Sequence, residues 1–457
     1  MSYRNLVSLF LSLCLLICMT SCGKEEKITG KTDENVFTEA QGSTENEDTA
    51  DETAVSTEEE KTEDTTTGEK NTEDVYEFSF LSPEKSFFTY FEWADGLDGA
   101  LVHSTHSFVK LNKTDAENYP EMAKLLSDNA VMQEKAMLEE FDNLVSIAGD
   151  EFEKNKQSFD TYVSSLNVLV RRADSIAVSL LWDSYSDYGN IENYRVFHGS
   201  NYDTKSGKEL RLTDVVKSVN NDLAKAVEKE LLSHTWTGEL KSKDAVENFF
   251  AEAPYDISNW TVDYNGVTFY FAPGELCNEG MMTATVSFSE YPELFHEKYM
   301  NVPKEYAVEL PQDISFFTEL DDDGALDQIS VSGAYDEERN KYTDHGVYTD
   351  KDGNSCIDDC FAYDLHPYYV RSEGGNYIYL FRQDFEEGVR LMSLVVYKLN
   401  EDGTVVNAGE ADMSPAQYGD NIFLVLNDPE NFILDDIGNE TEKASFRIGG
   451  DGIPVKK

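Results

Sequence analysis

The sequence predicts an α+β fold: an antiparallel sheet with covering helices in a first domain, followed by a mainly β second domain. Three observations lead to this prediction. Tyr76, Phe78 and Phe80 alternate with polar residues, as in a half-buried strand. Residues 137–148 then carry apolar side chains at helical spacing. From about Asp313 onward, apolar runs alternate with polar turns, which is typical of a small β domain.

The chain begins with the layout of a bacterial export signal. Arg4 precedes an apolar stretch at residues 6–19 that is too short to span a bilayer as a permanent helix. Small residues follow, and then Cys22, where a lipoprotein peptidase needs a thiol that can be acylated. An ordinary secretory signal with an incidental cysteine is the alternative. We expect residues 1–22 to form a lipoprotein signal, with Cys22 lipidated and the protein anchored on the extracytoplasmic face of the cell membrane.

A long acidic segment follows the signal. Residues 23–75 are rich in Thr, Glu, Asp, Lys and Ser and have almost no apolar side chains, so they cannot bury enough surface to offset the entropy of ordering. They are predicted to form a disordered tether. The whole chain carries a formal net charge of −52, which argues against nucleic acid as a partner and favours cationic proteins or metal ions.

The first domain is predicted to span residues 76–303. An amphipathic helix at about 129–152 precedes three runs that are typical of an antiparallel meander, at 159–171, 175–185 and 193–203. Asp214 is a natural N-cap for a helix that continues to about Ser233, and a weaker helix follows near 242–251. Further on, Asn265 and Gly266 stand between two alternating runs, which is a strong hairpin signal.

Motifs in this domain resemble an exported module. They are Asn201 to Gly207 with Leu210, Leu212 and Asp214, then Trp260, residues 266–271, Pro273-Gly274-Glu275 and Tyr291 to Leu294. This pattern is similar to the extracellular domain of RsiV-type lysozyme-sensing anti-sigma factors, which also precedes the catalytic domain of PdaC-type peptidoglycan deacetylases. The resemblance covers about Tyr76 to Tyr299, and Asn201 to Leu294 is its specific part.

The resemblance implies an α+β ectodomain and, in one branch of the family, direct binding of lysozyme through its active-site cleft. This chain shows no sigma-binding segment, no membrane helix before the module and no deacetylase metal motif of Asp with paired His. Sigma release and deacetylation therefore do not carry over. Most of the matching positions also have structural explanations as turn glycines, caps and aromatic strands.

The second domain is predicted to span residues 304–457 and contains three acidic turns. Asp321, Asp323 and Asp327 match Asp-x-Asp-Gly-x-x-Asp, a spacing found in calcium loops, where hard oxygens converge as glycine turns the backbone. The Asp-Gly turns at 350–354 and 400–403 lack that final Asp. An ordinary hairpin turn is the other interpretation of residues 321–327. Calcium bound by Asp321, Asp323 and Asp327 is thus the only cofactor that the sequence suggests.

Cysteine and histidine usage is sparse. After the signal region only Cys277, Cys356 and Cys360 remain, so either a Cys356–Cys360 disulfide across a turn or two free thiols is compatible with an exported protein. The seven histidines include no i, i+4 zinc pair; His103 and His106 come closest. We find no nucleophile elbow, phosphate loop or dinucleotide fingerprint and predict that the protein is not an enzyme.

These features predict a non-catalytic binding lipoprotein that engages a lysozyme-like cationic protein or a cell-wall glycan. Two alternatives stay open. One is an enzyme of cell-wall or glycan metabolism with a site assembled from scattered residues, and the other is a calcium-stabilised adhesion or scaffold protein. Exposed aromatic side chains favour glycan binding, convergent carboxylates with His favour catalysis, and an acidic face favours a cationic protein.

The first prediction concerns the anchor. Replacing Cys22 by Ala removes the thiol that is acylated, so the protein should leave the membrane fraction and lose metabolically incorporated fatty acid. Fractionation and labelled-palmitate incorporation measure both effects, with Cys277→Ala as the control. Equal membrane retention of the Cys22→Ala and unmodified chains contradicts the prediction.

Overall fold

The computed structural model describes residues 77–457, except residues 98, 190–193, 234–239, 253–258, 278–279, 322, 337–340, 351–353, 387–388, 413–421 and 436–442. The predicted signal peptide, the predicted lipidation residue Cys22 and the predicted tether lie outside the described residues. No helix in the described part is long and apolar enough to cross a membrane. The predicted α+β class is confirmed.

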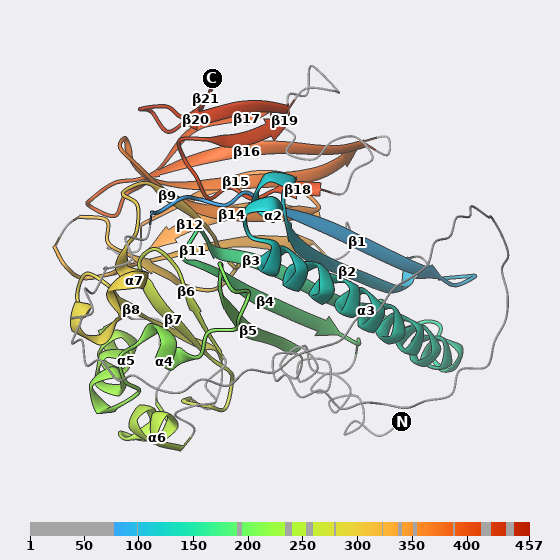
Figure 1. Cartoon of the computed structure of the whole chain (residues 1–457). Coiled ribbons are helices and arrows are strands. Elements are labelled where there is room, and N and C mark those ends of the chain that lie inside the picture. Colours follow the sequence, from blue (N-terminus) through green and yellow to red (C-terminus); the bar gives the residue numbers. More distant parts are fainter. Residues whose placement is uncertain are drawn as a thin grey trace, which may run out of the picture. The chain divides into compact units, whose positions relative to one another are not determined.

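A six-stranded sheet forms the centre of the first part (Figure 1), and one of its six strands, β18, comes from the C-terminal part of the chain. Its order is β18-β1-β2-β3-β4-β5, with β18 Ile422–Leu424, β1 Pro83–Trp93, β2 Ala100–Leu111, β3 Tyr162–Ala173, β4 Ala177–Asp187 and β5 Tyr194–Asp203. The meander β3-β4-β5 is antiparallel, as predicted.

The sheet is antiparallel except for one parallel pair, β2 with β3, which the sequence pattern did not indicate. The reason is the connection between the two strands. Parallel neighbours need a long crossover, and here α2 (Lys113–Asn118) and α3 (Pro120–Lys154) supply it. Figure 1 shows α3 lying along this sheet.

Helix α3 begins at Pro120 rather than near the predicted residue 129, because proline suits the first helical turn, where its missing N–H is not needed. Leu144, Ala148 and Phe152 of α3 pack against Leu101 and Val102 of β2. The apolar spacing therefore indicated the buried face correctly but not where the helix begins.

A smaller layer of helices and strands follows. Its sheet has the order β6-β7-β8 (Trp260–Val262, Gly266–Phe271 and Met282–Ser287), and its helices are α4 Leu212–Val215, α5 Asn221–Ser233, α6 Ala245–Glu252, the 3-10 helix η1 Pro292–Leu294 and α7 Glu297–Met300. The predicted helix from Asp214 to Ser233 is thus two helices. Asp214 is not an N-cap: it lies inside α4 and accepts a hydrogen bond from the Arg211 backbone N–H at 2.8 Å.

The predicted Asn265-Gly266 hairpin between β6 and β7 is confirmed. Gly266 does not adopt a positive φ. Asp263 Oδ1 closes the turn by accepting from the backbone N–H groups of Asn265 and Gly266, at 2.7 and 3.2 Å. A Cβ on Gly266 would lie 2.2 Å from the carbonyl oxygen of Val286, so the close approach of β8 requires glycine.

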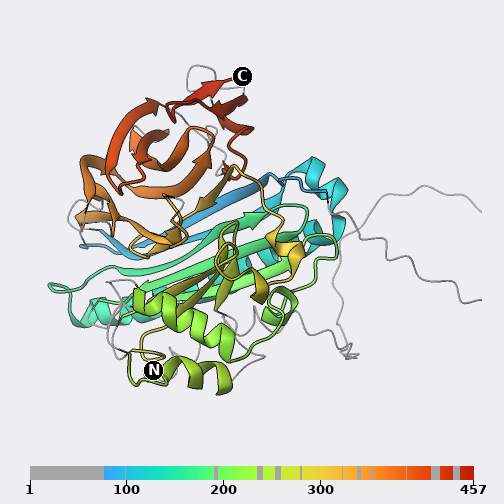
Figure 2. The same ribbon diagram turned by 90° about the vertical axis from the view of Figure 1, so that its left-hand side faces the viewer.

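The described residues from 304 onward form strands and no helix. A five-stranded sheet has the order β17-β16-β15-β14-β9, a four-stranded sheet β10-β11-β12-β13 and a three-stranded sheet β19-β20-β21. Figure 2 shows these strands in orange and red, curving around a common centre. Their bounds are β9 Tyr306–Glu309, β10 Phe316–Thr318, β11 Asp327–Asp336, β12 Lys341–Thr349, β13 Ser355–Ala362, β14 Asp364–Ser372, β15 Gly375–Glu386, β16 Val389–Leu399, β17 Val405–Asp412, β19 Phe432–Asp435, β20 Lys443–Ile448 and β21 Pro454–Lys456.

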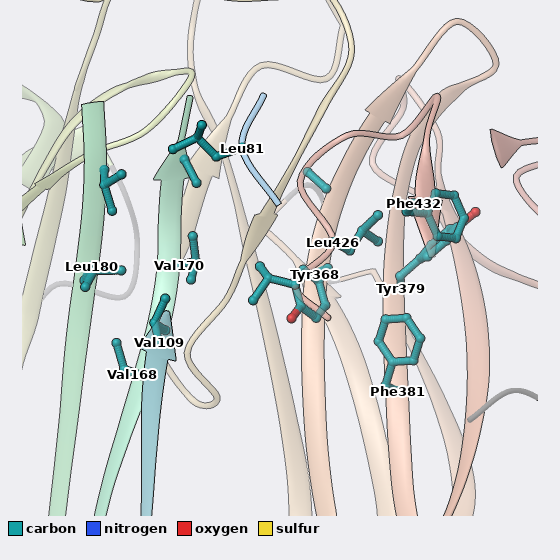
Figure 3. Packing of buried hydrophobic residues seen from close by; sticks show 14 of the residues in the cluster. Leu81, Val109, Val168, Val170, Leu180, Tyr368, Tyr379, Phe381, Leu426 and Phe432 are labelled. Carbon is teal, nitrogen blue, oxygen red and sulfur yellow. The ribbon is translucent and has the colours of Figure 1, made fainter. Parts of the chain in front are cut away.

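One apolar core joins the two predicted domains. Figure 3 shows its members from both sides of the predicted boundary at residues 303 and 304: Leu81, Val109, Val168, Val170 and Leu180, and then Tyr368, Tyr379, Phe381, Leu426 and Phe432. Residues 77–457 accordingly form one compact unit. The side chain of Asn427 strengthens the junction by donating to the carbonyl oxygens of Leu81 and Ala173, at 2.6 and 3.0 Å.

A buried ionic network crosses the same junction. Lys85 of β1 pairs with Glu309 of β9, and both side chains are at most 1% exposed. The second carboxylate oxygen of Glu309 accepts from the backbone N–H of Val170 at 3.0 Å, and its carbonyl oxygen accepts from the Arg171 guanidinium. Arg171 also binds Asp263 at 3.2 Å. These contacts link strands β1, β3 and β9 to the β6–β7 turn, and the side chains that make them are shielded from water.

The stability of this network is testable at Glu309. Glu309→Gln leaves the Lys85 ammonium buried without a counter-charge, so the free energy of unfolding should fall by about 3–5 kcal/mol. Urea unfolding measures the change. Glu410→Gln is the matched control, because Glu410 pairs with Arg382 but is 54% exposed, and it should cost no more than about 1 kcal/mol. Equal losses in the two variants would show that burial does not determine the effect.

Candidate functional site

Of the predicted calcium residues, Asp321 and Asp323 lie in the loop between β10 and β11, and Asp327 begins β11. Carboxylate oxygens of Glu319, Asp321 and Asp323 lie within 4.8 Å of one another, an arrangement that suits a hard cation. Asp327 is not part of this group. It is buried and accepts from the backbone N–H of Leu320 at 2.8 Å, so it holds the loop onto β11.

Sequence spacing missed Glu319 because it precedes the motif. The loop itself needs glycine: Gly324 has φ +87°, and its N–H donates to Glu319 at 2.6 Å. Asp323 Oδ1 accepts from the Ala325 N–H at 2.8 Å. The loop is therefore shaped by its own acidic side chains, and the candidate ligand set is Glu319, Asp321 and Asp323.

Cys356 and Cys360 are free thiols in the structure, so the disulfide that the sequence offered as one alternative is not formed. Both lie on the extended strand β13 rather than across a turn. Residues four positions apart in a strand are separated by roughly 13 Å, well beyond the ~7 Å that a disulfide tolerates between Cα atoms. Of the two alternatives, the structure thus has the free thiols. Burial raises the pKa of Cys360 to about 11, which disfavours its reactive thiolate.

The described histidines do not form a metal site. His106 is 2% exposed, neither of its ring nitrogens has a partner among the described residues, and burial lowers its pKa to about 4. His345 Nε2 lies 2.6 Å from the hydroxyl of Tyr397, which donates to Asp358 at 2.6 Å. This chain of hydrogen bonds joins β12, β16 and β13. Because burial raises the pKa of Tyr397 and lowers that of His345, both side chains stay neutral near pH 7.

Exposed aromatic rings lie together near the turn that joins β1 to β2. Phe91 and Trp93 are 46% and 64% exposed. Their ring centroids lie 5.8 Å apart with near-parallel planes, and Phe91 stacks on His103 of β2 at 4.4 Å. We call Phe91, Trp93 and His103 the aromatic platform. Sequence reasoning noted only His103, because alternation along a strand does not show which end stays outside the core.

A cavity of about 870 Å³ lies where the two predicted domains meet. Its lining comes from the β6–β7 turn, the turn after β8, Met300 and residues 302–306, and also from Glu319, Leu326 and residues 371–373. Its wall includes the buried ring of Tyr306, whose pKa burial raises to about 12, partly offset by the Arg371 guanidinium. We call it the junction pocket. No local motif indicates it, because its sides come from distant segments.

Two of the solved structures to which this chain is similar are members of one family of unknown function. One is a DUF3298 family member from Bacteroides fragilis, 15% identical to this chain, covering 48% of this chain and 93% of its own, with a TM-score of 0.34. The other is a DUF3298 family protein from Pseudomonas aeruginosa, also 15% identical, covering 48% and 96%, with a TM-score of 0.31. No protein-family model and no curated protein matches the chain.

Calcium binding is testable with two similar aspartates. Asp323 and Asp402 each precede a glycine and each accept from the backbone N–H two residues later, but only Asp323 belongs to the acidic group. If calcium binds, Asp323→Asn should abolish the calorimetric heat and the calcium-dependent rise in Tm, whereas Asp402→Asn should preserve both. The absence of heat and of any melting shift in the unmodified chain would exclude the site.

Proposed function

We propose that this protein is an exported, lipid-anchored binding protein that engages cell-wall glycan through the aromatic platform. The single observation that carries this proposal is the stacked, exposed arrangement of Phe91, Trp93 and His103. The lipid anchor on Cys22 and the tether at 23–75 are part of the proposal and place the binding domain outside the cell membrane.

The platform suits a sugar because of the chemistry of both surfaces. One face of a pyranose ring presents C–H groups, and a flat aromatic ring can pack against it while the hydroxyl groups stay in water. Trp93 is 64% exposed, so much of its apolar surface is in contact with water. A partner that covers this surface removes it from water, and the hydrophobic effect then favours binding. His103 Nε2 lies 3.1 Å from the Thr105 hydroxyl, which orients the ring beneath Phe91.

A second candidate partner is a cationic protein such as lysozyme, and a different observation favours it. The net charge of −52 would accelerate encounter with a positively charged protein and would make that binding weaken with salt. We also propose that residues 76–299 belong to the RsiV/PdaC-type family, and the motifs between Asn201 and Leu294 support this proposal. With either partner, the protein would bind without catalysis.

The glycan proposal predicts the effect of one truncation. Trp93→Ala should weaken retention on insoluble peptidoglycan by about 2 kcal/mol, or roughly thirtyfold, because an exposed aromatic anchor carries a large share of binding energy. Val131→Ala is the matched control, since Val131 is also 64% exposed but lies on α3. Co-sedimentation measures both.

The outcomes separate the candidate partners. Loss of glycan retention in Trp93→Ala alone supports the platform. Unchanged retention in Trp93→Ala removes the platform from the proposal. Retention of lysozyme at low but not moderate salt, with no retention of peptidoglycan, would replace the glycan by the cationic protein.

A further inference from the structure

The junction pocket has the size and wall of a small-molecule site. Its volume of about 870 Å³ falls within the ~300–1,000 Å³ of ligand pockets, and such pockets occur preferentially where domains meet. The rings of Tyr264, Phe288 and Tyr306 are each at most 7% exposed and give the wall a rigid apolar part. Tyr306 is fixed because its hydroxyl donates to Asn265, which also accepts from Thr318 at 3.2 Å.

Charged side chains of both signs share this pocket. Lys304 and Arg371 contribute positive charge, and Glu305, Glu319 and Glu373 contribute negative charge. Glu305 is already engaged, because it accepts from the backbone N–H of Glu373. Glu319 belongs to the acidic loop and lies in the pocket wall as well, so the pocket and the loop are continuous at this residue.

This charge pattern selects among ligand classes. A polyanion such as a nucleotide would meet more carboxylates than cationic groups and would be repelled. A neutral glycan hydrogen-bonds to ionised side chains but carries no counter-charge, so covering them costs more desolvation free energy than pairing them with opposite charges. A zwitterion can pair with both signs at once, and an apolar body between its charged ends matches the aromatic wall.

Two polar side chains of the pocket lining support a ligand with hydrogen-bonding groups. Asn265 Nδ2 and Ser372 Oγ are buried and have no hydrogen-bond partner among the described residues. Buried polar atoms in proteins are nearly always paired, so these atoms need a partner that water or a ligand supplies. Peptide carbonyl groups accept from an amide N–H and from a hydroxyl.

We propose that the junction pocket binds a short zwitterionic peptide. Its terminal carboxylate pairs with Lys304 and Arg371, and its terminal ammonium pairs with Glu319. The backbone carbonyl groups lie toward Asn265 and Ser372, and the side chains lie against the aromatic wall. This site is separate from the aromatic platform, so the inference does not rest on glycan binding.

Isothermal titration of the purified full chain with trialanine tests the proposal. The matched probe is the same peptide with an acetylated N-terminus and an amidated C-terminus, which has no charged ends. Trialanine should bind at least about tenfold more tightly than the capped peptide, because each end loses a charge-assisted hydrogen bond on capping. EDTA in the buffer keeps cations away from Glu319.

Variants locate the binding. Lys304→Ala should weaken trialanine binding by about tenfold. Lys135→Ala should not change it, because Lys135 is an exposed lysine on α3, with a side chain that is 78% exposed. Trp93→Ala should also leave it unchanged, which separates this site from the platform. No binding of trialanine at millimolar concentration, equal binding of the capped peptide, or equal effects of the two lysine variants would overturn the proposal.

Discussion

The buried ionic network is the constraint on which the rest of the fold depends. Lys85, Arg171, Asp263 and Glu309 are all at most 2% exposed, so each has lost its hydration. Removing an ion from water costs several kcal/mol in a real protein unless partners replace the water. Since these four partners come from β1, β3, the β6–β7 turn and β9, only one arrangement of those elements satisfies all of the charges. The apolar core can tolerate small shifts, whereas the network cannot.

The network also explains why residues 77–457 form one unit although the sequence pattern changes near residue 303. Apolar contacts alone would allow two domains to pack loosely, as many neighbouring domains do. Here the Arg172 guanidinium donates to the Tyr299 carbonyl oxygen at 2.8 Å and pairs with Asp174 at 2.7 Å, close to the predicted boundary. At the other end of residues 300–306, the Tyr306 hydroxyl donates to Asn265. Both ends of this linker are therefore held, which favours a fixed geometry between the two halves.

Local patterns in the sequence predicted the local elements well. Alternation located β3, β4 and β5, and the Asn265-Gly266 pair located a hairpin. Non-local pairing was not predictable: the parallel contact of β2 with β3 depends on the crossover through α3, and the pairing of β18 with β1 joins the two ends of the folded chain. The candidate sites follow the same division. Spacing identified Asp321 and Asp323, but Glu319 and the pocket wall become neighbours only when distant strands pack.

The position of the junction pocket follows from the network. Asp263, which pairs with Arg171, is followed directly by Tyr264 and Asn265 of the pocket wall. Glu309, which pairs with Lys85, ends the strand that begins with Tyr306 on the same wall. The hydrogen bond from Tyr306 to Asn265 then closes the connection between the two elements. The charges that fix the fold thus also fix the β6–β7 turn and β9 relative to each other in the pocket wall, so a ligand meets a preformed wall and little ordering is needed on binding.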